Sequence, residues 1–503
     1  MGLPLFVSPA GHLEYRALRL HNHMSGRELR DHIRLGACAA ALALGAMLAG
    51  LPVAAQGPAE KRLPASRAEA QLSYAPLVKR TAPAVVNIYT KRTVRALPSP
   101  LFNDPFFRRF FGDQFPGGGS ERVQNSLGSG VIVDSKGVIV TNNHVIKGAD
   151  EITVVLADRR EFEATVLRAD ERTDLAVLRI DAGAEVLPRI ELRNSDEVEV
   201  GDLVLAIGNP FGVGQTVTSG IVSAVARTTV GIADFRFFIQ TDAAINPGNS
   251  GGALVAMDGR LIGINTAIYS RDGGSNGIGF AIPSNMVRTV LAGVGTGARI
   301  VRPWFGADGQ TVTPDLAASI GLDRPRGVLV AEVYPGSPAA RAGVERGDVI
   351  VAVDGFDIDD EPSLRFRIAT RDIGVAVRFA LWRDGRQREV QAALVAPPET
   401  PPREMTPLRG NHPLAGATLA NLSPALADEI GYDGAPRGVI VLEIRRGSAA
   451  QAIRLAPGDV LLKINERDLR TVEDVQRAIQ RDGLPWRMRI RRGERVLNLT
   501  VTG

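Results

Sequence analysis

Three features of the sequence predict a mainly β protein, with a barrel or sandwich domain followed by two copies of a smaller module. Between residues 84 and 267, apolar segments of strand length recur, with turn signals such as D-S-K-G and M-D-G-R between them. That density of short strands is typical of a sandwich or barrel. No helix-length periodic stretch interrupts these segments, which disfavours a doubly wound α/β fold. The third feature is an internal repeat in residues 301–503.

The expected strands are short, and most of them are rich in β-branched residues, which suit a pleated, half-buried surface. They cover residues 84–89, 129–133, 138–141, 152–156, 176–180, 203–207, 237–241 and 261–267.

The repeat consists of three motifs that recur in the same order. G-V-L-V, G-S-P-A-A and G-D-V-I begin at residues 327, 336 and 347, and G-V-I-V, G-S-A-A and G-D-V-L begin at 438, 447 and 458. Because each offset is 111 residues, we expect two tandem copies of one module. Residues 396–407, A-P-P-E-T-P-P-R-E-M-T-P, predict a proline-rich, semi-rigid linker between them.

The composition indicates a soluble, globular chain of about three domains. Of its 503 residues, 45% are hydrophobic and 23% are charged, and the formal net charge is +4. No long basic run is present, which argues against nucleic acid as a main partner.

The N-terminal region has the pattern of a secretory signal. Arg27, Arg30 and Arg34 precede an apolar stretch at residues 35–55, which ends with the small residues Val53 and Ala55. This pattern predicts a signal peptide, residues 1–55, that is cleaved after Ala55. The alternative is an uncleaved membrane anchor, because the apolar stretch is just long enough to span a bilayer.

The single cysteine, Cys38, lies inside this leader. A chain without the leader has no disulfide, no cysteine nucleophile and no cysteine-based metal site, and we expect no metal and no cofactor. Such an exported chain fits a bacterial periplasm, where nothing obliges a protein to use disulfides.

One stretch, D-A-A-I-N-P-G-N-S-G-G-A-L-V at residues 242–255, crowds three glycines around Ser250. Glycines this dense form either a bare turn or a site where the backbone approaches another group closely. The second interpretation makes Ser250 a candidate nucleophile, and histidine is the usual base for a serine. Four of the six histidines lie in the leader, so His144 and His412 remain.

The same motif also satisfies the G-x-S-x-G nucleophile elbow of α/β-hydrolases. That elbow requires a helix after the serine, and the order serine, acid, histidine along the chain. Here residues 253–255 and 261–267 indicate a β-hairpin, and only His412 follows Ser250. The elbow therefore fails, which leaves the order His, Asp, Ser on an all-β scaffold, with His144 as the base.

The acid is expected between residues 144 and 250, and spacing alone does not choose among the aspartates there. The candidates are Asp150, Asp158, Asp170, Asp174, Asp181, Asp196, Asp202, Asp234 and Asp242. Asp174 opens a strongly apolar strand in R-T-D-L-A-V-L-R-I, where a carboxylate could be held rigidly.

Four motifs in order, T-N-N-H-V, T-D-L-A-V-L, G-N-S-G-G-A-L and I-G-F-A-I-P-S-N-M, resemble the HtrA (Do-like, DegP/DegQ) family of exported serine proteases. The resemblance extends over nearly the whole chain after the leader. It implies a trypsin-like double β-barrel protease domain followed by two PDZ domains. Carried over by motif, it also implies that His144, Asp174 and Ser250 form the catalytic triad.

These expectations divide the chain as follows. They give a signal peptide at 1–55, a polar segment at 56–75, the protease domain at 76–297, a first PDZ domain at 300–395, the linker at 396–407 and a second PDZ domain at 408–503.

In a triad of this kind, Ser250 attacks the peptide carbonyl, His144 takes and returns the proton, and Asp174 holds the imidazole tautomer. The backbone N–H groups of Gly248 and Ser250 are the expected oxyanion hole. A side chain at position 248 would obstruct that approach, which accounts for the dense glycines.

The substrate pocket is expected to be small and apolar. Ala244 and Ile245 occupy the stretch before the serine, Ile278 lies in the later strand, and Tyr269 narrows the same wall. An acidic base of the pocket would instead give cleavage after Lys or Arg. Asp242 is close enough to leave that alternative open, although a structural hydrogen-bonding role is favoured.

PDZ domains bind a peptide at a sheet edge, and a Φ-G-Φ loop supplies backbone N–H groups for its C-terminal carboxylate. Two tripeptides match that position, Phe305-Gly306-Ala307 and Ala415-Gly416-Ala417. For the second copy, a plain glycine turn is the alternative.

Residues 100–119 contain six phenylalanines between Pro and Gly residues, too many to bury locally. By the same resemblance, this insertion reaches a neighbouring subunit in a trimer-based homo-oligomer. The alternative is a hydrophobic cluster packed on its own barrel. The loop R-D-G-G-S-N-G at 271–277 is expected to be mobile and to gate the pocket.

The expected function is that of an exported, ATP-independent serine endopeptidase that degrades unfolded or misfolded envelope proteins in the periplasm. The PDZ modules would capture polypeptide C-termini, and membrane association would follow only from an uncleaved leader. The alternative is a PDZ-based chaperone or peptide-binding protein with little or no proteolysis. An intact His, Asp and Ser set disfavours that alternative, because a pure binder has no need of it.

Overall fold

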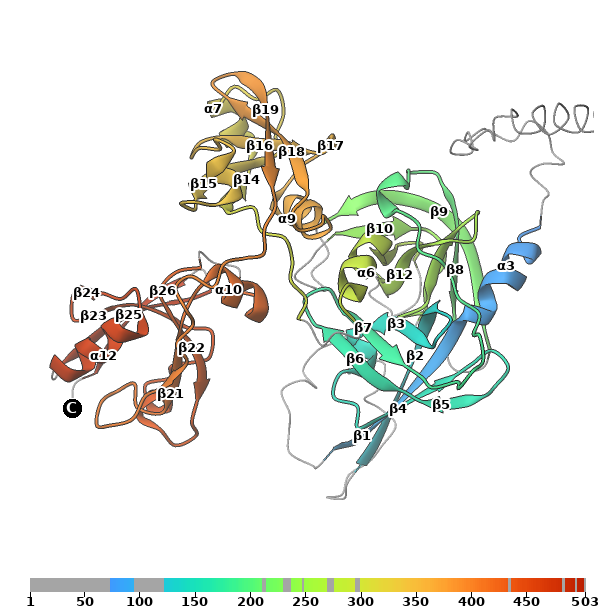
Figure 1. Cartoon of the computed structure of the whole chain (residues 1–503), viewed down its shortest axis with the longest axis horizontal. Helices are drawn as coiled ribbons and strands as arrows, with labels where there is room; N and C mark the ends of the chain where they lie inside the picture. The colour runs from blue at the N-terminus through green and yellow to red at the C-terminus, as the bar shows by residue number, and fades with distance from the viewer. Residues whose placement is uncertain are drawn as a thin grey trace, which may run out of the picture. The chain divides into compact units, whose positions relative to one another are not determined.

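The computed structural model describes residues 73–94, 122–209, 214–228, 237–246, 248–268, 276–294, 299–432, 436–481, 485–493 and 495–501. Almost all of these residues belong to the second of two compact units, Tyr74–Gly503. Strands dominate them, so the prediction of a mainly β protein is confirmed (Figure 1). No helix among the described residues is long and apolar enough to cross a membrane.

The chain first forms a seven-stranded antiparallel sheet, in the order β5-β4-β1-β2-β3-β7-β6. Its strands are β1 (Val85–Val94), β2 (Arg122–Asp134), β3 (Val138–Asn142), β4 (Glu151–Val155), β5 (Glu161–Glu163), β6 (Thr165–Asp170) and β7 (Leu175–Arg179). Three short helices accompany them: α3 (Ala75–Thr81), η1 (Ala82–Ala84) and α5 (Asn143–Ile146). Because α5 directly follows β3, the residues of T-N-N-H-V lie at the end of that strand.

A closed six-stranded barrel follows, in the order β10-β13-β12-β11-β8-β9. Its strands are β8 (Leu203–Gly208), β9 (Thr216–Arg227), β10 (Phe238–Thr241), β11 (Ala253–Ala256), β12 (Leu261–Ile268) and β13 (Gly279–Pro283). The turn η3 (Ser195–Glu197) precedes the barrel, and helix α6 (Ser284–Leu291) follows it.

Strand β8 shows why its sequence is apolar throughout instead of alternating. Val204 and Ala206 lie in the core inside the barrel, whereas Leu205 and Ile207 lie in the core shared with the first sheet. Both faces of the strand are therefore buried, and each apolar residue contributes to one of the two cores. The segments T-N-N-H-V and G-N-S-G-G lie where these two sheets meet.

The first repeat forms a sheet in the order β14-β15-β16-β18-β19, with β17 paired to β16. Its elements are β14 (Ala307–Thr311), α7 (Pro314–Ser319), β15 (Val328–Val333), α8 (Pro338–Arg341), β16 (Val349–Val353), β17 (Phe356–Asp357), α9 (Glu361–Ala369), β18 (Ala376–Arg383) and β19 (Arg386–Ala393).

The second repeat forms the corresponding sheet, in the order β20-β21-β22-β23-β25-β26, with β24 paired to β23. Its elements are β20 (Thr406–Pro407), β21 (Ala417–Asn421), α10 (Pro424–Ile430), β22 (Val439–Ile444), α11 (Ala449–Ala452), β23 (Val460–Ile464), β24 (Arg467–Asp468), α12 (Val472–Arg481), β25 (Trp486–Arg492) and β26 (Arg495–Val501).

The repeated sequence motifs have repeated structural roles. In G-D-V-I and G-D-V-L the aspartates, Asp348 and Asp459, are fully buried. Each carboxylate pairs with an arginine near the end of a later strand: Arg383 Nε lies 2.5 Å from Asp348, and Arg492 Nε lies 2.6 Å from Asp459. A buried carboxylate requires such a partner, which explains why both copies carry the same residue.

The serine of G-S-P-A-A and G-S-A-A begins a helix in both copies. Ser337 accepts a hydrogen bond from Ala340 N at 3.0 Å, and Ser448 accepts one from Gln451 N at 3.3 Å. Serine is among the best residues for this position, because its hydroxyl satisfies an N–H group that has no partner within the helix.

The two repeats differ at one sheet edge. Among the residues that the structure describes, strand β14 pairs only with β15 and so ends its sheet, whereas β21 is covered on the corresponding side by the short strand β20. Because a peptide is added to a sheet through an exposed edge, this difference bears on which repeat can bind one.

Candidate active site

The structure brings His144 and Asp174 into direct contact. His144 Nδ1 lies 2.7 Å from Asp174 Oδ2, and the backbone N–H of His144 donates to Asp174 Oδ1 at 2.9 Å. The aspartate side chain is 9% exposed and the imidazole is 31% exposed. Of the nine candidate aspartates, Asp234 lies outside the described residues, and Asp174 is the one among the other eight that bonds to His144.

Strand pairing explains why these two residues meet. Strands β3 and β7 are antiparallel neighbours with Asn142 opposite Leu175, so the residue after β3 and the residue before β7 lie at the same end of the sheet. The Asp174 carbonyl accepts hydrogen bonds from Asn142 Nδ2 and Asn143 N, both at 3.0 Å. This fixes Asp174 although its φ of 55° lies in the left-handed region, which is costly for a non-glycine residue.

A third donor reaches the Asp174 carboxylate from the barrel. Thr266 on β12 donates its hydroxyl to Asp174 Oδ2 at 2.9 Å, and this threonine is buried. The carboxylate therefore accepts three hydrogen bonds, two of which come from His144. Because a carboxylate only accepts, the ring of His144 must carry its proton on Nδ1, which leaves Nε2 to act as a base.

Ser250 lies between β10 and β11, on the barrel side of the junction. Its Oγ donates to the Thr266 carbonyl at 3.2 Å, and its own carbonyl accepts a hydrogen bond from Ser129 N at 2.8 Å. Within the described part of the chain, no hydrogen bond joins Ser250 Oγ to His144. Thr266 thus contacts both Ser250 and Asp174, and Asp174 contacts His144.

The backbone N–H groups around Ser250 form two sets: those that donate to a carbonyl of the described chain, and those that do not. Those of Asn249, Gly251 and Gly252 donate to the carbonyls of Asn246, Asn265 and Asn249, at 3.0, 2.8 and 2.9 Å. The N–H groups of Gly248 and Ser250, which we predict as the oxyanion hole, donate to none of the residues that the structure describes.

Two of the clustered glycines are needed for their conformation. Gly248 has a φ of 96° and Gly251 a φ of 85°, a region that L side chains rarely adopt. A Cβ at position 251 would also lie 2.0 Å from the Ser129 carbonyl. The Gly248 carbonyl accepts a hydrogen bond of 2.6 Å from Ser129 Oγ, which in turn accepts one from Asn209 N at 2.9 Å.

The sequence gives Ser129 and Thr266 no sign of a role in the site. Both lie on strands, and an isolated serine or threonine in a strand carries no signal of its role. They become functional candidates only because β2 and β12 place them against the Gly248 carbonyl and the Asp174 carboxylate.

The expected pocket residues are only partly described. Ile245 is buried, and Ile278 is half-buried. A Cβ at Gly279 would lie 2.7 Å from Ile245 Cδ1, so Ile245 packs against the start of β13. Asp242 Oδ1 accepts a hydrogen bond from Ile221 N at 2.7 Å, which is the structural role favoured for it. Tyr269 and residues 271–275 of the expected gating loop lie outside the described residues.

The two candidate carboxylate loops share their backbone form. Gly306 has a φ of 81° and Gly416 a φ of 91°, and a Cβ on either would lie within about 2.3 Å of the helix-capping serine, Ser337 or Ser448. Phe305 is buried and stacks on Phe379, with the ring centroids 4.0 Å apart, so its side chain belongs to the core.

The loops differ in what their N–H groups bond. In the second repeat, the N–H groups of Ala415, Gly416 and Ala417 donate to the carbonyls of His412, Leu408 and Leu414 at 3.0, 2.9 and 3.1 Å. In the first repeat, those of Phe305 and Gly306 donate to none of the described residues. Only the first loop therefore presents N–H donors that the described part of the chain does not use.

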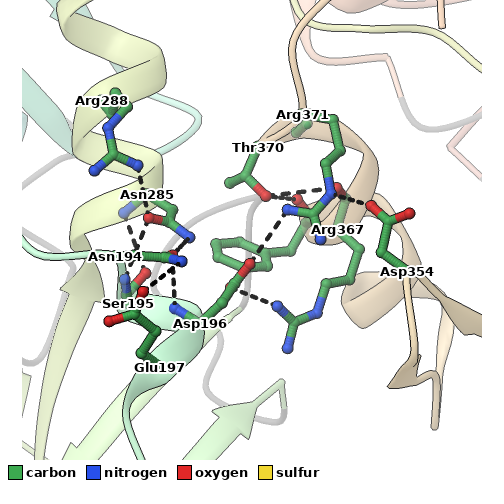
Figure 2. Close-up of polar contacts among 12 residues, drawn as sticks. Asn194, Ser195, Asp196, Glu197, Asn285, Arg288, Asp354, Arg367, Thr370 and Arg371 are labelled. Atoms are coloured by element: carbon green, nitrogen blue, oxygen red, sulfur yellow. Dashed lines mark hydrogen bonds and ion pairs between the residues drawn. The ribbon is translucent and has the colours of Figure 1, made fainter. Parts of the chain in front are cut away.

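Helix α9 of the first repeat also contacts the turn η3 that precedes the barrel (Figure 2). Arg367 Nη1 and Arg371 Nη1 lie 2.5 and 3.2 Å from the carboxylate of Asp196 on η3. Phe366 stacks on Phe237, which directly precedes β10, with ring centroids 3.8 Å apart. Burial lowers the pKa of the Arg367 guanidinium from its ordinary value, while the adjacent Asp196 carboxylate acts in the opposite direction.

Other expectations fall outside the described residues. These are the signal peptide, residues 56–72 of the polar segment predicted at 56–75, and the phenylalanine-rich residues 100–119. The structure shows no group of three or more metal-ligating side chains among the residues it describes.

Comparisons with known proteins agree with the division seen in the structure. A trypsin-like peptidase domain matches residues 128–264, and two PDZ domain families match residues 306–394 and 440–492. A serine-peptidase fold with its histidine and aspartate in contact, followed by two PDZ domains, defines the class: this is a PDZ-containing serine endopeptidase.

Two bacterial relatives cover most of the chain. The periplasmic serine endoprotease DegP of Escherichia coli (strain K12) is 36% identical over 483 residues, which are 92% of this chain and 98% of the relative. The periplasmic pH-dependent serine endoprotease DegQ of the same strain is 40% identical over 413 residues, which are 81% of this chain and 86% of the relative. A solved structure of the HtrA-type protease AlgW with a decapeptide is 47% identical, with a TM-score of 0.48, and covers 65% of this chain and 99% of that one. This chain belongs to the HtrA family of serine endoproteases, the group that contains DegP and DegQ.

Proposed function

We propose that this endopeptidase cleaves unfolded polypeptides in the periplasm with His144, Asp174 and Ser250 as its triad. The observation that carries the proposal is the contact between His144 Nδ1 and Asp174 Oδ2 at 2.7 Å, because it leaves Nε2 as the only ring nitrogen able to accept a proton. Ser250 lies against Thr266, the residue that also donates to that carboxylate.

The chemistry begins with rotation of the Ser250 hydroxyl from the Thr266 carbonyl towards the His144 ring. Oγ then attacks the substrate carbonyl while Nε2 accepts the hydroxyl proton, and the same proton is returned to the leaving amine. The Asp174 carboxylate stabilises the charged imidazole, and the N–H groups of Gly248 and Ser250 bind the oxyanion. Ser129 holds the Gly248 peptide unit in place through its 2.6 Å hydrogen bond.

The pocket is proposed to accept small aliphatic side chains. Ile245 and Ile278 supply apolar surface, and the carboxylate of Asp242 is directed to Ile221 N instead of being available to a Lys or Arg side chain. Cleavage after Val or Ala therefore fits these residues better than cleavage after a basic residue.

We assign capture of a peptide carboxylate to the first PDZ domain. Its strand β14 ends the sheet, and the N–H groups of Phe305 and Gly306 have no acceptor among the described residues. In the second PDZ domain, β20 covers the edge, and the Leu408 carbonyl already accepts the N–H of Gly416. The second copy is therefore not assigned this role.

Helix α9 could transmit the binding of a peptide at the first PDZ domain to the protease domain. Its first residue, Glu361, donates its N–H to Thr311 on β14 at 3.0 Å, and Arg367 on the same helix pairs with Asp196 of the protease domain. A peptide added along β14 would contact a helix that the protease also contacts. A coupling between two sites of this kind typically changes an affinity by about 5- to 150-fold.

Export by a signal peptide cleaved after Ala55 and assembly into a trimer-based homo-oligomer complete the proposal. The names of the relatives, which describe periplasmic proteases, support the compartment. Unfolded or misfolded envelope proteins are the proposed substrates, and their C-termini are the proposed PDZ ligands.

Digestion of casein by the full chain tests this proposal. The wild type should degrade casein without ATP, and Ser250→Ala should not, while circular dichroism and gel filtration give the same fold and size for both. Equal digestion by the two proteins would rule out Ser250 as the nucleophile. A chaperone without proteolysis would leave casein intact in both.

A further inference from the structure

We infer that Arg302, in the stretch between helix α6 and strand β14, is a positioning residue for the catalytic aspartate. This inference rests on the proposed triad. Arg302 is not part of the active site, but its guanidinium lies against Asp170, the last residue of β6, and Asp170 opens the turn that ends at Asp174.

The contact is a buried ion pair. Arg302 Nη2 lies 2.5 Å from Asp170 Oδ2, and both side chains are 7% exposed. A carboxylate buried to this extent must be neutralised by a partner or protonated. Arg168, which also lies near Asp170, has its guanidinium on the carbonyls of Val290, Ala292 and Gly293. Among the ion pairs of the described residues, Arg302 is the cation seen against this carboxylate.

Asp170 in turn fixes the shape of the turn. Strands β6 and β7 pair with Asp170 opposite Leu175, so residues 171–174 form the whole connection between them. The Asp170 carboxylate accepts the Thr173 hydroxyl at 2.7 Å and the backbone N–H of Arg172 at 3.3 Å. Two of the four turn residues are therefore held by the group that Arg302 neutralises.

The last residue of the turn is the one that catalysis needs in a fixed place. Asp174 follows Thr173 directly and has a φ of 55°, a conformation that persists only when the surroundings enforce it. Its carboxylate must stay on His144 Nδ1, and a displacement of about 1 Å at a catalytic group can cost as much as 10²-fold in rate. We therefore expect loss of the charge on Arg302 to act on the rate constant of the chemical step.

A second carboxylate makes the effect asymmetric. Arg302 Nη1 lies 3.8 Å from Asp428 on α10, whose carboxylate Arg172 Nη1 contacts at 2.5 Å, so the arginine keeps a nearby carboxylate when Asp170 is neutralised. Asp170, by contrast, loses its contacting cation when Arg302 is replaced. Removing the arginine alone should thus be worse than removing the aspartate charge alone, and removing both should be milder than removing the arginine.

The test uses the full chain and a chromogenic peptide too short to reach the PDZ domains. Arg302→Met should lower kcat about tenfold with KM within about twofold of wild type, and should slow phosphorylation of Ser250 by diisopropyl fluorophosphate to the same extent. In that reaction Ser250 Oγ bonds to phosphorus, fluoride leaves and His144 takes the proton, so no peptide binding is involved. The matched control is Arg299→Met, because Arg299 lies in the same segment but is exposed and pairs with Glu429.

Restoration is the decisive result. Asp170→Asn combined with Arg302→Met leaves a neutral pair. The asparagine amide oxygen still accepts the N–H of Arg172, and its NH₂ group donates to the Thr173 hydroxyl. The kcat of this double variant should therefore recover to within about threefold of wild type. If Arg302→Met folds poorly, Thr173→Val tests the same turn without exposing a charge and should lower kcat about threefold.

Three results would overturn the inference. They are a kcat for Arg302→Met equal to that of Arg299→Met, no recovery in the double variant, or an unchanged kcat for Thr173→Val. Asp174→Asn is assayed alongside as the reference. If that variant is also fully active, the proposed triad itself is wrong, which is a different failure from loss of the Arg302 effect alone.

Discussion

Replacement of Asp174 by asparagine probes the one triad member that sequence spacing did not select. Asparagine keeps the shape of the side chain but exchanges one carboxylate oxygen for an NH₂ group. The Oδ1 position faces the backbone N–H of His144 at 2.9 Å, which can only donate, so the amide oxygen must occupy it. The NH₂ group then faces His144 Nδ1, at the position where Oδ2 lies 2.7 Å from that nitrogen.

This orientation reverses the tautomer of the imidazole. Nδ1 becomes an acceptor, the ring proton moves to Nε2, and Nε2 can no longer take the proton of Ser250. Loss of the correct tautomer in a Ser-His-Asp triad lowers kcat about 10⁴-fold. At about 1.36 kcal/mol for each factor of ten, the transition state loses about 5.4 kcal/mol of stabilisation.

The assay is kcat on a chromogenic peptide, with thermal unfolding measured in parallel. Asp242→Asn is the matched control, since an amide oxygen can still accept the hydrogen bond from Ile221 N, and it should keep kcat within about twofold. If Asp174→Asn lowers kcat only a few-fold, the tautomer argument is wrong and another residue must be the acid of the triad.

Further predictions concern the oxyanion loop, the pocket and the first PDZ domain. Ser129→Ala removes the hydroxyl between the Gly248 carbonyl and Asn209 N, and should lower kcat about tenfold; an unchanged kcat would show that Ser129 does not position the loop. Mass spectrometry of casein fragments should show cuts after Val, Ala and similar residues, and cuts mainly after Lys or Arg would contradict the apolar pocket. Peptides with a free apolar C-terminus should raise cleavage of an unrelated reporter several-fold, whereas equal activation by the amidated peptides would exclude carboxylate capture. Asp196→Asn, which weakens the pair with Arg367, should change the size of that activation; an unchanged response would show that α9 does not transmit it.

Much of the fold follows from local patterns in the sequence. Apolar segments bounded by turn residues predicted eight strands, each of which overlaps a strand of the structure. Strand β9 is among those that were not predicted, and Gly220 interrupts its sequence, Thr216–Arg227. Gly220 is there for a tertiary reason, since a Cβ would lie 2.3 Å from Asp242 Oδ1. No pattern within the strand itself carries that information.

The residues of the candidate site also differ in whether a local sequence pattern could indicate them. His144 and Ser250 could be proposed from the sequence by elimination and by the dense glycines, since both signals are local. The choice of Asp174 among nine aspartates required the resemblance to a family, because it depends on the β3–β7 register. The contacts of Ser129 and Thr266 join β2 and β12 to distant segments, and no local pattern distinguishes such residues from ordinary strand residues.

Covalent labelling tests the central claim, that Ser250 is the activated nucleophile, most directly. The full chain is incubated with diisopropyl fluorophosphate, and the modified residue is located by mass spectrometry of its peptides while casein digestion is followed in the same samples. We predict one adduct per chain, on Ser250, that forms in step with the loss of digestion and is absent from Ser250→Ala. An adduct on another residue, or digestion that persists after complete modification of Ser250, would contradict the account.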